Sequence, residues 1–220
     1  MSQNTKNLIA ALHSTPRRHR HSWTDTKGFH TWTEEEIAKF EAFHAEGTNA
    51  RLALNLLLYT AQRRGDVVKL GWQNIRGNRL HVIQQKTGVE LDLFILPELA
   101  QTLQTLPHDK PTFLTNGLGN PFTAAGFGNW FRDRCTEAGL TNCTAHGLRK
   151  AAARRMAEGG MSADTIKAVT GHTNLKQVSV YTAAANQAAL AERGIKAISG
   201  KKKRTEIVQP VAKVGQTEGK

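Results

Sequence analysis

Apolar side chains recur every three to four residues along most of the chain, which is the spacing of amphipathic helices. The first such stretch, "TWTEEEIAKFEAF", has Thr33 and Glu36 three positions apart, which predicts a helix N-terminus closed by a capping box. The next, "ARLALNLLLYTA", is apolar on nearly every side and predicts a buried helix. Further helical segments are predicted at residues 65–72, 97–106, 123–139, 146–159, 162–170 and 175–198.

The pattern changes between residues 79 and 96. The stretches "RLHVIQQ" and "VELDLFIL" are short and rich in β-branched and aliphatic side chains, and "KTG" lies between them, which predicts a β-hairpin. Residues 1–27 have no sustained period, and residues 199–220 are polar and charged, so we expect a disordered tail there. The sequence predicts a mainly α-helical domain with one small antiparallel β-sheet, an α+β fold, over residues 28–198.

The charge of the chain is concentrated at its two ends. The net charge is +12 at pH 7. Residues 1–27 contain five basic side chains and one acidic one, and residues 201–220 contain six and two, so the ends carry +8 of the total. Lys and Arg side chains gain affinity for polyanions by releasing condensed counterions, so we expect a nucleic-acid partner. A surface made basic only for solubility is the alternative that charge alone leaves open.

Cysteine usage and hydropathy argue against a disulfide-rich, metal-binding, membrane-spanning or secreted protein. Cys135 and Cys143 are the two cysteines, and neither belongs to a paired metal-ligand spacing, so we expect no disulfide framework and no metal. No apolar run approaches the roughly 20 residues that span a bilayer. The first residues lack the apolar core and cleavage site of a signal peptide. We therefore expect a cytoplasmic protein without a membrane partner.

Several side chains could bind a phosphate group. In "TAHGLRKAAARRM", His146 and Arg149 lie about one helical turn apart, so both can face the same group. Arg63 and Arg64 follow the predicted buried helix, where an arginine is costly unless it meets an anion. A structural pair with Asp66 is the alternative there.

Three more candidates follow along the chain. Lys86 lies on the predicted hairpin turn, and His172 and Tyr181 lie nine positions apart in "GHTNLKQVSVY". Taken alone, a turn lysine is usually solvated, and an isolated histidine or tyrosine usually has a structural role.

The order of these residues is more specific than any one of them. "LLLYTAQRRGDVVKL", the hairpin lysine, "TAHGLRKAAA" and "VTGHTNLKQVSVYT" together resemble the arginine, lysine, H-x-L-R and G-H-x8-Y boxes of tyrosine recombinases, the phage integrase family, over residues 28–198. The resemblance implies that family's catalytic-domain fold and the catalytic residues Arg63, Lys86, His146, Arg149, His172 and Tyr181. It implies that Asp66 buttresses the first arginine. Ala61 stands where the family usually has glycine, and Arg64 directly follows Arg63, so the choice of first arginine depends on the register of the box.

The implied reaction is transesterification of a DNA phosphodiester without a cofactor. Tyr181 attacks phosphorus, and because a phenol with a pKa of roughly 10 is a poor nucleophile, a nearby base such as His146 helps it. Arg63 and Arg149 offer rigid N–H donors to the charge that grows on the phosphate oxygens, and His172 can donate another hydrogen bond. Lys86 would protonate the departing 5′-oxygen.

The resemblance also implies partners and limits. Double-stranded DNA is the expected substrate, bound by a homo-oligomer in the cytoplasm at the nucleoid, and the chain would derive from a phage or another mobile element. The family usually has a DNA-binding domain before the catalytic one, and residues 1–27 are at most a basic arm or a remnant of it, so the chain is either truncated or dependent on partner subunits. Two alternatives remain, a catalytically silent DNA-binding remnant and a type IB topoisomerase-like enzyme. The further basic side chains expected to contact DNA are Arg64, Lys150, Arg154, Arg155, Lys201, Lys202, Lys203 and Arg204.

Overall fold

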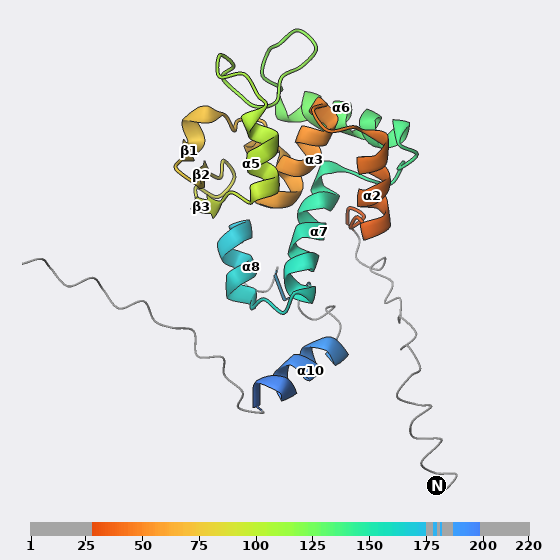
Figure 1. Ribbon diagram of the computed structural model, residues 1–220, viewed down its shortest axis with the longest axis vertical. Helices are drawn as coiled ribbons and strands as arrows, with labels where there is room; N and C mark the ends of the chain where they lie inside the picture. Colours follow the sequence, from red (N-terminus) through yellow and green to blue (C-terminus); the bar gives the residue numbers. More distant parts are fainter. Residues whose placement is uncertain (1–27, 175–177, 180, 182–186, 199–220) are drawn as a thin grey trace, which may run out of the picture. The chain divides into compact units, whose positions relative to one another are not determined.

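The computed structural model describes residues 28–174, 178–179, 181 and 187–198 (Figure 1). The described residues up to 181 and those from 187 onward belong to two separate compact units. The helices of the first unit are α2 (Glu34–Phe43), α3 (Asn49–Thr60), α4 (Arg64–Val67), α5 (Pro97–Gln104), α6 (Ala124–Glu137), α7 (Ala145–Glu158) and α8 (Ala163–Thr170), with the 3-10 helix η1 (Trp72–Asn74). The second unit contains α10 (Gln187–Ile198).

Five of the described helices begin at hydroxyl side chains. In α2, Thr33 accepts the N–H of Glu36 while the Glu36 carboxylate accepts the N–H of Thr33, so the predicted capping box is confirmed. The same kind of N-cap precedes α3, α6, α7 and α8, where the residues are Thr48, Thr123, Thr144 and Ser162. Each such cap contributes about 1 kcal/mol to helix stability, because it satisfies a backbone donor that has no partner inside the helix.

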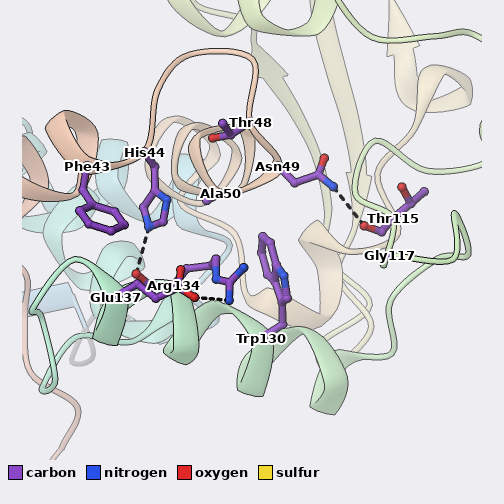
Figure 2. Close-up of a pocket in the computed structure, with 10 residues that line it drawn as sticks. All are labelled: Phe43, His44, Thr48, Asn49, Ala50, Thr115, Gly117, Trp130, Arg134 and Glu137. Carbon is purple, nitrogen blue, oxygen red and sulfur yellow. Dashed lines mark hydrogen bonds and ion pairs between the residues drawn. The ribbon is translucent and has the colours of Figure 1, made fainter.

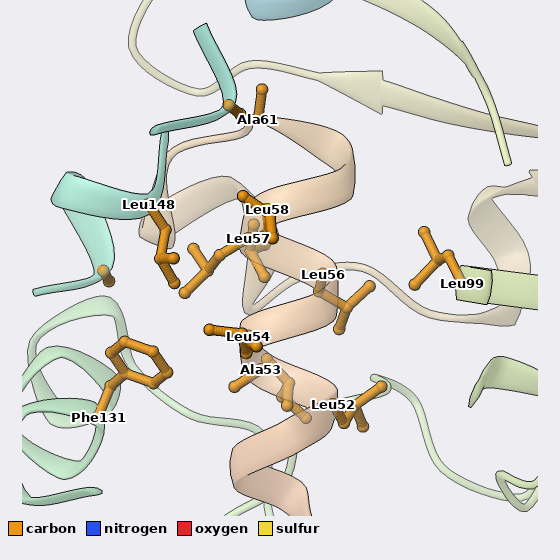
Figure 3. Close-up of a cluster of buried hydrophobic side chains, with 14 of the residues drawn as sticks. Leu52, Ala53, Leu54, Leu56, Leu57, Leu58, Ala61, Leu99, Phe131 and Leu148 are labelled. Atoms are coloured by element: carbon orange, nitrogen blue, oxygen red, sulfur yellow. The ribbon is translucent and has the colours of Figure 1, made fainter. Parts of the chain in front are cut away.

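Helix α3 is the centre of the hydrophobic core. Its leucines are buried on every side, as the sequence predicted. Figure 3 shows them between Leu99 of α5, Phe131 of α6 and Leu148 of α7. Because α3 is fixed from several directions, the residues that follow its C-terminus are held firmly in place.

The three strands form one antiparallel sheet in the order β1 (Ile75–Arg76), β2 (Arg79–Ile83) and β3 (Glu90–Phe94). Strands β2 and β3 form the predicted hairpin, in register from Arg79 opposite Phe94 to Ile83 opposite Glu90. Their alternate side chains are buried, and the loop at residues 84–89 carries Lys86. The predicted fold class is confirmed, and β1 is an addition that the sequence did not indicate.

Some expectations fall partly or wholly outside the described residues. Of the helix predicted at residues 175–198, the structure describes α10 and a few positions before it. The basic arm at residues 1–27 and the tail at residues 199–220 lie outside the description, so both stay predictions. None of the described helices is long and apolar enough to cross a membrane.

Candidate active site

Arg149 lies at the centre of the candidate site. It projects from α7 and is only 3% exposed. Its Nη1 donates to the backbone oxygen of Ala61 at 2.7 Å, and its Nη2 donates to Nε2 of His172 at 3.2 Å. Burial, and after it the charge of Arg63, lowers the pKa of Arg149 to about 10, so the side chain remains a cation at neutral pH. The site therefore contains a fixed, largely dehydrated positive charge.

The oxygen that accepts from Arg149 is presented by an unusual turn. Ala61 ends α3 with φ = 53° and ψ = 23°, the left-handed conformation. A side chain with a Cβ costs about 1–2 kcal/mol in this region, and glycine avoids that cost. The resemblance has glycine at this position, and the positive φ gives the physical reason. Alanine keeps the turn at an energetic cost.

The hydrogen bonds of His172 fix its tautomer. Arginine can only donate, so Nε2 of His172 must be the acceptor of the bond from Arg149. The proton is then on Nδ1, which donates to Oγ1 of Thr170 at 2.7 Å, and Thr170 donates onward to the oxygen of Ile166. Burial, followed by the charges of Arg149 and Arg63, lowers the pKa of His172 to about 4. The resemblance implied that His172 donates a hydrogen bond to the phosphate, and for Nε2 to do so the ring must release Arg149 and gain a proton on Nε2.

His146 occupies the first turn of α7, about one helical turn from Arg149. Its ring is accessible and packs against the Phe29 ring, with 4.9 Å between the centroids. The pKa of His146 is lowered from its ordinary value, first by lost hydration and then by the charges of Arg149 and Lys150. A neutral, accessible imidazole at pH 7 is able to accept a proton.

Arg63 and Arg64 point to different places. Arg63 donates to Oε1 of Gln84 at 2.7 Å, and its charge lowers the pKa of Arg149. The Arg64 guanidinium lies over α6, so close to Gly128 that a Cβ there would be 2.4 Å from its Nη1. The geometry therefore favours Arg63 as the first arginine, in the register that the sequence indicated.

Asp66 does not buttress Arg63 in the way the resemblance implied. Its Oδ1 accepts the backbone N–H of Gln85 at 2.9 Å, and its Oδ2 is buried without a hydrogen-bond partner in the described part of the chain. The side chain that holds Arg63 is Gln84. Asp66 thus anchors the hairpin loop, because its Oδ1 accepts a backbone N–H that the turn would otherwise leave unpaired.

Lys86 is exposed at the tip of that anchored loop. The neighbouring Gln85 side chain donates to the oxygen of Gly65 at 2.8 Å, which ties the loop to the start of α4. The base of the loop is held near Arg63, and its lysine remains accessible to a bound ligand.

Tyr181 is partly buried. Burial raises the pKa of its phenol, and the positive charge of Arg149 acts in the opposite direction, which places the two side chains in the same electrostatic environment. The phenol is therefore protonated at neutral pH and needs a base before it can act as a nucleophile.

Three of the other predicted DNA contacts have protein partners in the described part of the chain. Arg154 and Arg155 both pair with Glu34 of α2. Arg154 is only 5% exposed, so it is not part of a solvated face. Lys150 donates to the backbone oxygen of Phe29 at 2.8 Å. The basic residues 201–204 lie outside the described residues, and their DNA contacts stay predictions.

Sequence reasoning missed Gln84. Leu80 and Val82 are the inward-facing residues of β2, and Gln84 continues that alternation into the turn and is completely buried. A polar residue at an inward-facing position was the available signal, because a buried amide must find hydrogen-bond partners.

Two other features are separate from the site. His30, Glu36 and Cys143 place potential metal ligands within 4.8 Å of one another, but the Glu36 carboxylate is occupied by His30 and the capping box. A pocket of about 360 Å³ lies between the start of α3, the turn at residues 115–117 and α6. Figure 2 shows its lining residues, among which Trp130 and Arg134 lie side by side. The pocket shares no residue with the candidate site.

The comparisons with known proteins agree on one family. The model of the phage integrase family matches residues 31–188. The chain is 28% identical to a shufflon-specific DNA recombinase of Escherichia coli over 68% of this chain and 38% of that protein. It is 28% identical to the tyrosine recombinase XerC of Staphylococcus carnosus over 72% of this chain and 58% of that protein. The chain thus spans about half the length of these curated relatives.

Solved structures share the fold. A lambda integrase dimer bound to a COC′ core site matches with a TM-score of 0.60 and 24% identity, over 81% of this chain and 68% of that chain. The Tn1549 transposon integrase in complex with transposon right end DNA matches with a TM-score of 0.64 and 17% identity, over 80% of this chain and 67% of that chain.

Proposed function

Because the chain belongs to the phage integrase family, we propose that it cuts and rejoins double-stranded DNA through a 3′-phosphotyrosine intermediate, as the catalytic part of a site-specific recombinase. The observation that carries the proposal is the grouping of Arg63 and two neutral histidines around the buried guanidinium of Arg149, with Tyr181 in the same electrostatic environment. The mobile-element origin and a place at the nucleoid, in the cytoplasm, belong to the same proposal.

The proposed cleavage step is a displacement at phosphorus. The phenol oxygen of Tyr181 bonds to phosphorus, and the bond from phosphorus to the 5′-oxygen breaks. His146 accepts the phenol proton, since its lowered pKa leaves the imidazole neutral at pH 7. Lys86 gives a proton to the departing 5′-oxygen. The products are a 3′-phosphotyrosine and a free 5′-hydroxyl, and attack by such a hydroxyl reverses the step.

The two arginines supply the electrostatic part. Charge increases on the non-bridging oxygens as the phenol attacks, and preorganised donors in a dehydrated site stabilise that charge without reorganising. Arg149 is held by Ala61 and His172, and Arg63 by Gln84, so both are fixed before DNA arrives. Strand exchange additionally needs several subunits on DNA, and we propose a homo-oligomer for that step.

The alternatives predict different products. A catalytically silent DNA-binding remnant would bind duplex DNA without forming a covalent adduct. A type IB topoisomerase-like enzyme would relax supercoiled DNA as a monomer. The relatives and structures named above are recombinases and integrases, which favours strand transfer.

The test uses both tyrosines of the chain. The protein is incubated with a library of nicked duplexes that carry a randomised core, and covalent adducts are separated on a denaturing gel and mapped by mass spectrometry. We expect an adduct at Tyr181 that Tyr181→Phe abolishes with DNA binding retained. The matched control is Tyr59→Phe on α3, which should keep the adduct. An adduct at Tyr59, or none from the whole library, would contradict the proposal.

A further inference from the structure

One buried amide connects the supports of three proposed catalytic residues. The Gln84 side chain is completely buried at the end of β2. Its Oε1 accepts from Nη1 of Arg63 at 2.7 Å and from Oγ1 of Thr87 at 2.8 Å. Its Nε2 donates to Oε1 of Gln62 at 2.6 Å and to the oxygen of Thr170 at 2.8 Å. A carboxamide has two donors and two acceptor sites, so all four are in use.

The partners determine which way the amide points. Arg63 can only donate, so Oε1 must face it, and the backbone oxygen of Thr170 can only accept, so Nε2 must face that oxygen. Gly171 makes the second contact possible. It has φ = +66°, and a Cβ there would lie 2.4 Å from Nε2 of Gln84, so a side chain at this position would displace the amide.

Each partner holds a different part of the site. Gln62 precedes Arg63 and donates to the oxygen of Val169 in α8. Thr87 is the neighbour of Lys86 in the hairpin loop. Thr170 ends α8, and its hydroxyl accepts from Nδ1 of His172. The amide therefore joins the segment after α3, the hairpin loop and the C-terminus of α8.

We propose that Gln84 is a positioning residue that acts through Arg63 and keeps its guanidinium, the loop of Lys86 and the support of His172 in one arrangement before DNA binds. This inference depends on the proposed function, because it assigns Gln84 to the same reaction. Gln84 does not touch the phosphate. Gln84 restrains the Arg63 guanidinium through its hydrogen bond. The restraint matters because a small displacement of a transition-state donor is enough to slow the reaction strongly.

The central variant is Gln84→Met, which keeps the length of the side chain and removes all four hydrogen bonds. We expect single-turnover cleavage to slow by about tenfold to a hundredfold while the Kd for duplex DNA stays within about twofold. The matched control is Asn55→Leu, at another buried amide, which donates to the hydroxyl of Thr102 in α5 and bonds no described residue of the candidate site. That variant should lose stability without losing cleavage rate, so comparing the melting temperatures of both separates loss of fold from loss of positioning.

Two readouts test whether Gln84 acts through Arg63. In a double-mutant cycle with Arg63→Ala, the combined loss should be smaller than the product of the single losses. A methylphosphonate diester lacks the negative charge that the arginine meets, so on this substrate the penalties of Gln84→Met and Arg63→Ala should shrink together. Independent, fully multiplicative losses, or a Gln84→Met penalty unchanged on the methylphosphonate, would overturn the assignment.

A measurement without cleavage separates this inference from the proposed function. In nitrogen-15 NMR spectra of the whole chain, rotation about the Cζ–Nη1 bond of Arg63 should be slow in the wild type and fast in Gln84→Met, because the hydrogen bond to Oε1 is lost. If the wild type forms no covalent adduct but shows this change, the proposed function fails and the positioning contact stands. Equal rotation in both proteins refutes the positioning role whatever the cleavage assay gives.

Discussion

Acidification should destabilise this chain through His172 in a specific pH window. The folded protein holds this ring neutral because burial and the charges of Arg149 and Arg63 lower its pKa from 6.5 to about 4. An unfolded chain binds a proton at this histidine below about pH 6.5. Between those two values the unfolded state carries one more proton than the folded state, so stability is complete above pH 6.5 and falls as the pH drops toward 4.

The expected loss follows from the size of the shift. One proton of difference changes the free energy of unfolding by about 1.4 kcal/mol per pH unit. Going from pH 6.5 to 5 therefore costs at most about 2 kcal/mol from this ring, and we expect about 1 kcal/mol, because the His172 side chain is only partly buried. Such a change is a measurable part of a total stability of about 5–15 kcal/mol.

The assay compares urea unfolding of the wild type and His172→Gln at several pH values between 7 and 5. The variant has its own stability at pH 7, since two hydrogen bonds change, so the slope of the free energy against pH is compared. The pKa of His146 is also lowered, and this residue is present in both proteins, so the difference between the curves isolates His172. Parallel curves would show that burial and the neighbouring arginines do not keep His172 neutral.

Other predictions concern the reaction and DNA binding. Arg63→Ala should slow cleavage by about 10²–10³-fold and Arg64→Ala only slightly, and the opposite result would move the arginine register by one. Arg149→Lys should restore little of the activity lost in Arg149→Ala, because lysine lacks the planar fork, and near-wild-type rates in Arg149→Lys would refute that reason. Lys86→Ala should be slow on ordinary DNA and near wild type when sulfur replaces the 5′-bridging oxygen, whereas equal slowing would demote Lys86 to positioning. Deleting residues 201–220 should flatten the salt dependence of duplex binding by about 0.9 per lost phosphate contact, and an unchanged slope would mean an inert tail.

Local rules predicted most of the secondary structure. The capping box at Thr33, the buried helix α3 and the hairpin depend on residues close together in the sequence, and all three are confirmed. Strand β1 has two residues and pairs with β2 through Ile75 and Arg76. So short a segment has no period of its own, and its conformation follows from the partner strand.

The candidate site was predictable only as a set of residue types. The order of the boxes identified Arg63, Arg149, His172 and Tyr181, but it did not indicate what each side chain touches. Arg154 illustrates the difference, since it lies on the same helix as Arg149 and binds Glu34 of α2, 120 positions away. Which arginine reaches the site depends on the packing of α7 against its neighbours, and periodicity alone does not specify that.

Burial determines the direction of each pKa shift at the site, and the positive charges add to it at Arg149 and His172. After burial, the charge of Arg63 lowers the pKa of Arg149, and the charges of both arginines lower the pKa of His172. The carboxylate of Asp66 raises the pKa of Arg149 only as a minor contribution. Asp66 is engaged with the hairpin loop, and Arg63 is held by the neutral amide of Gln84. The positive charges of Arg63 and Arg149 are therefore close together, and neutral hydrogen-bond acceptors hold both side chains in place. An anion placed beside Arg149 would reverse the unfavourable Coulomb contributions, so a bound phosphate should raise the pKa of His172 and allow Nε2 to become the donor that the chemistry requires.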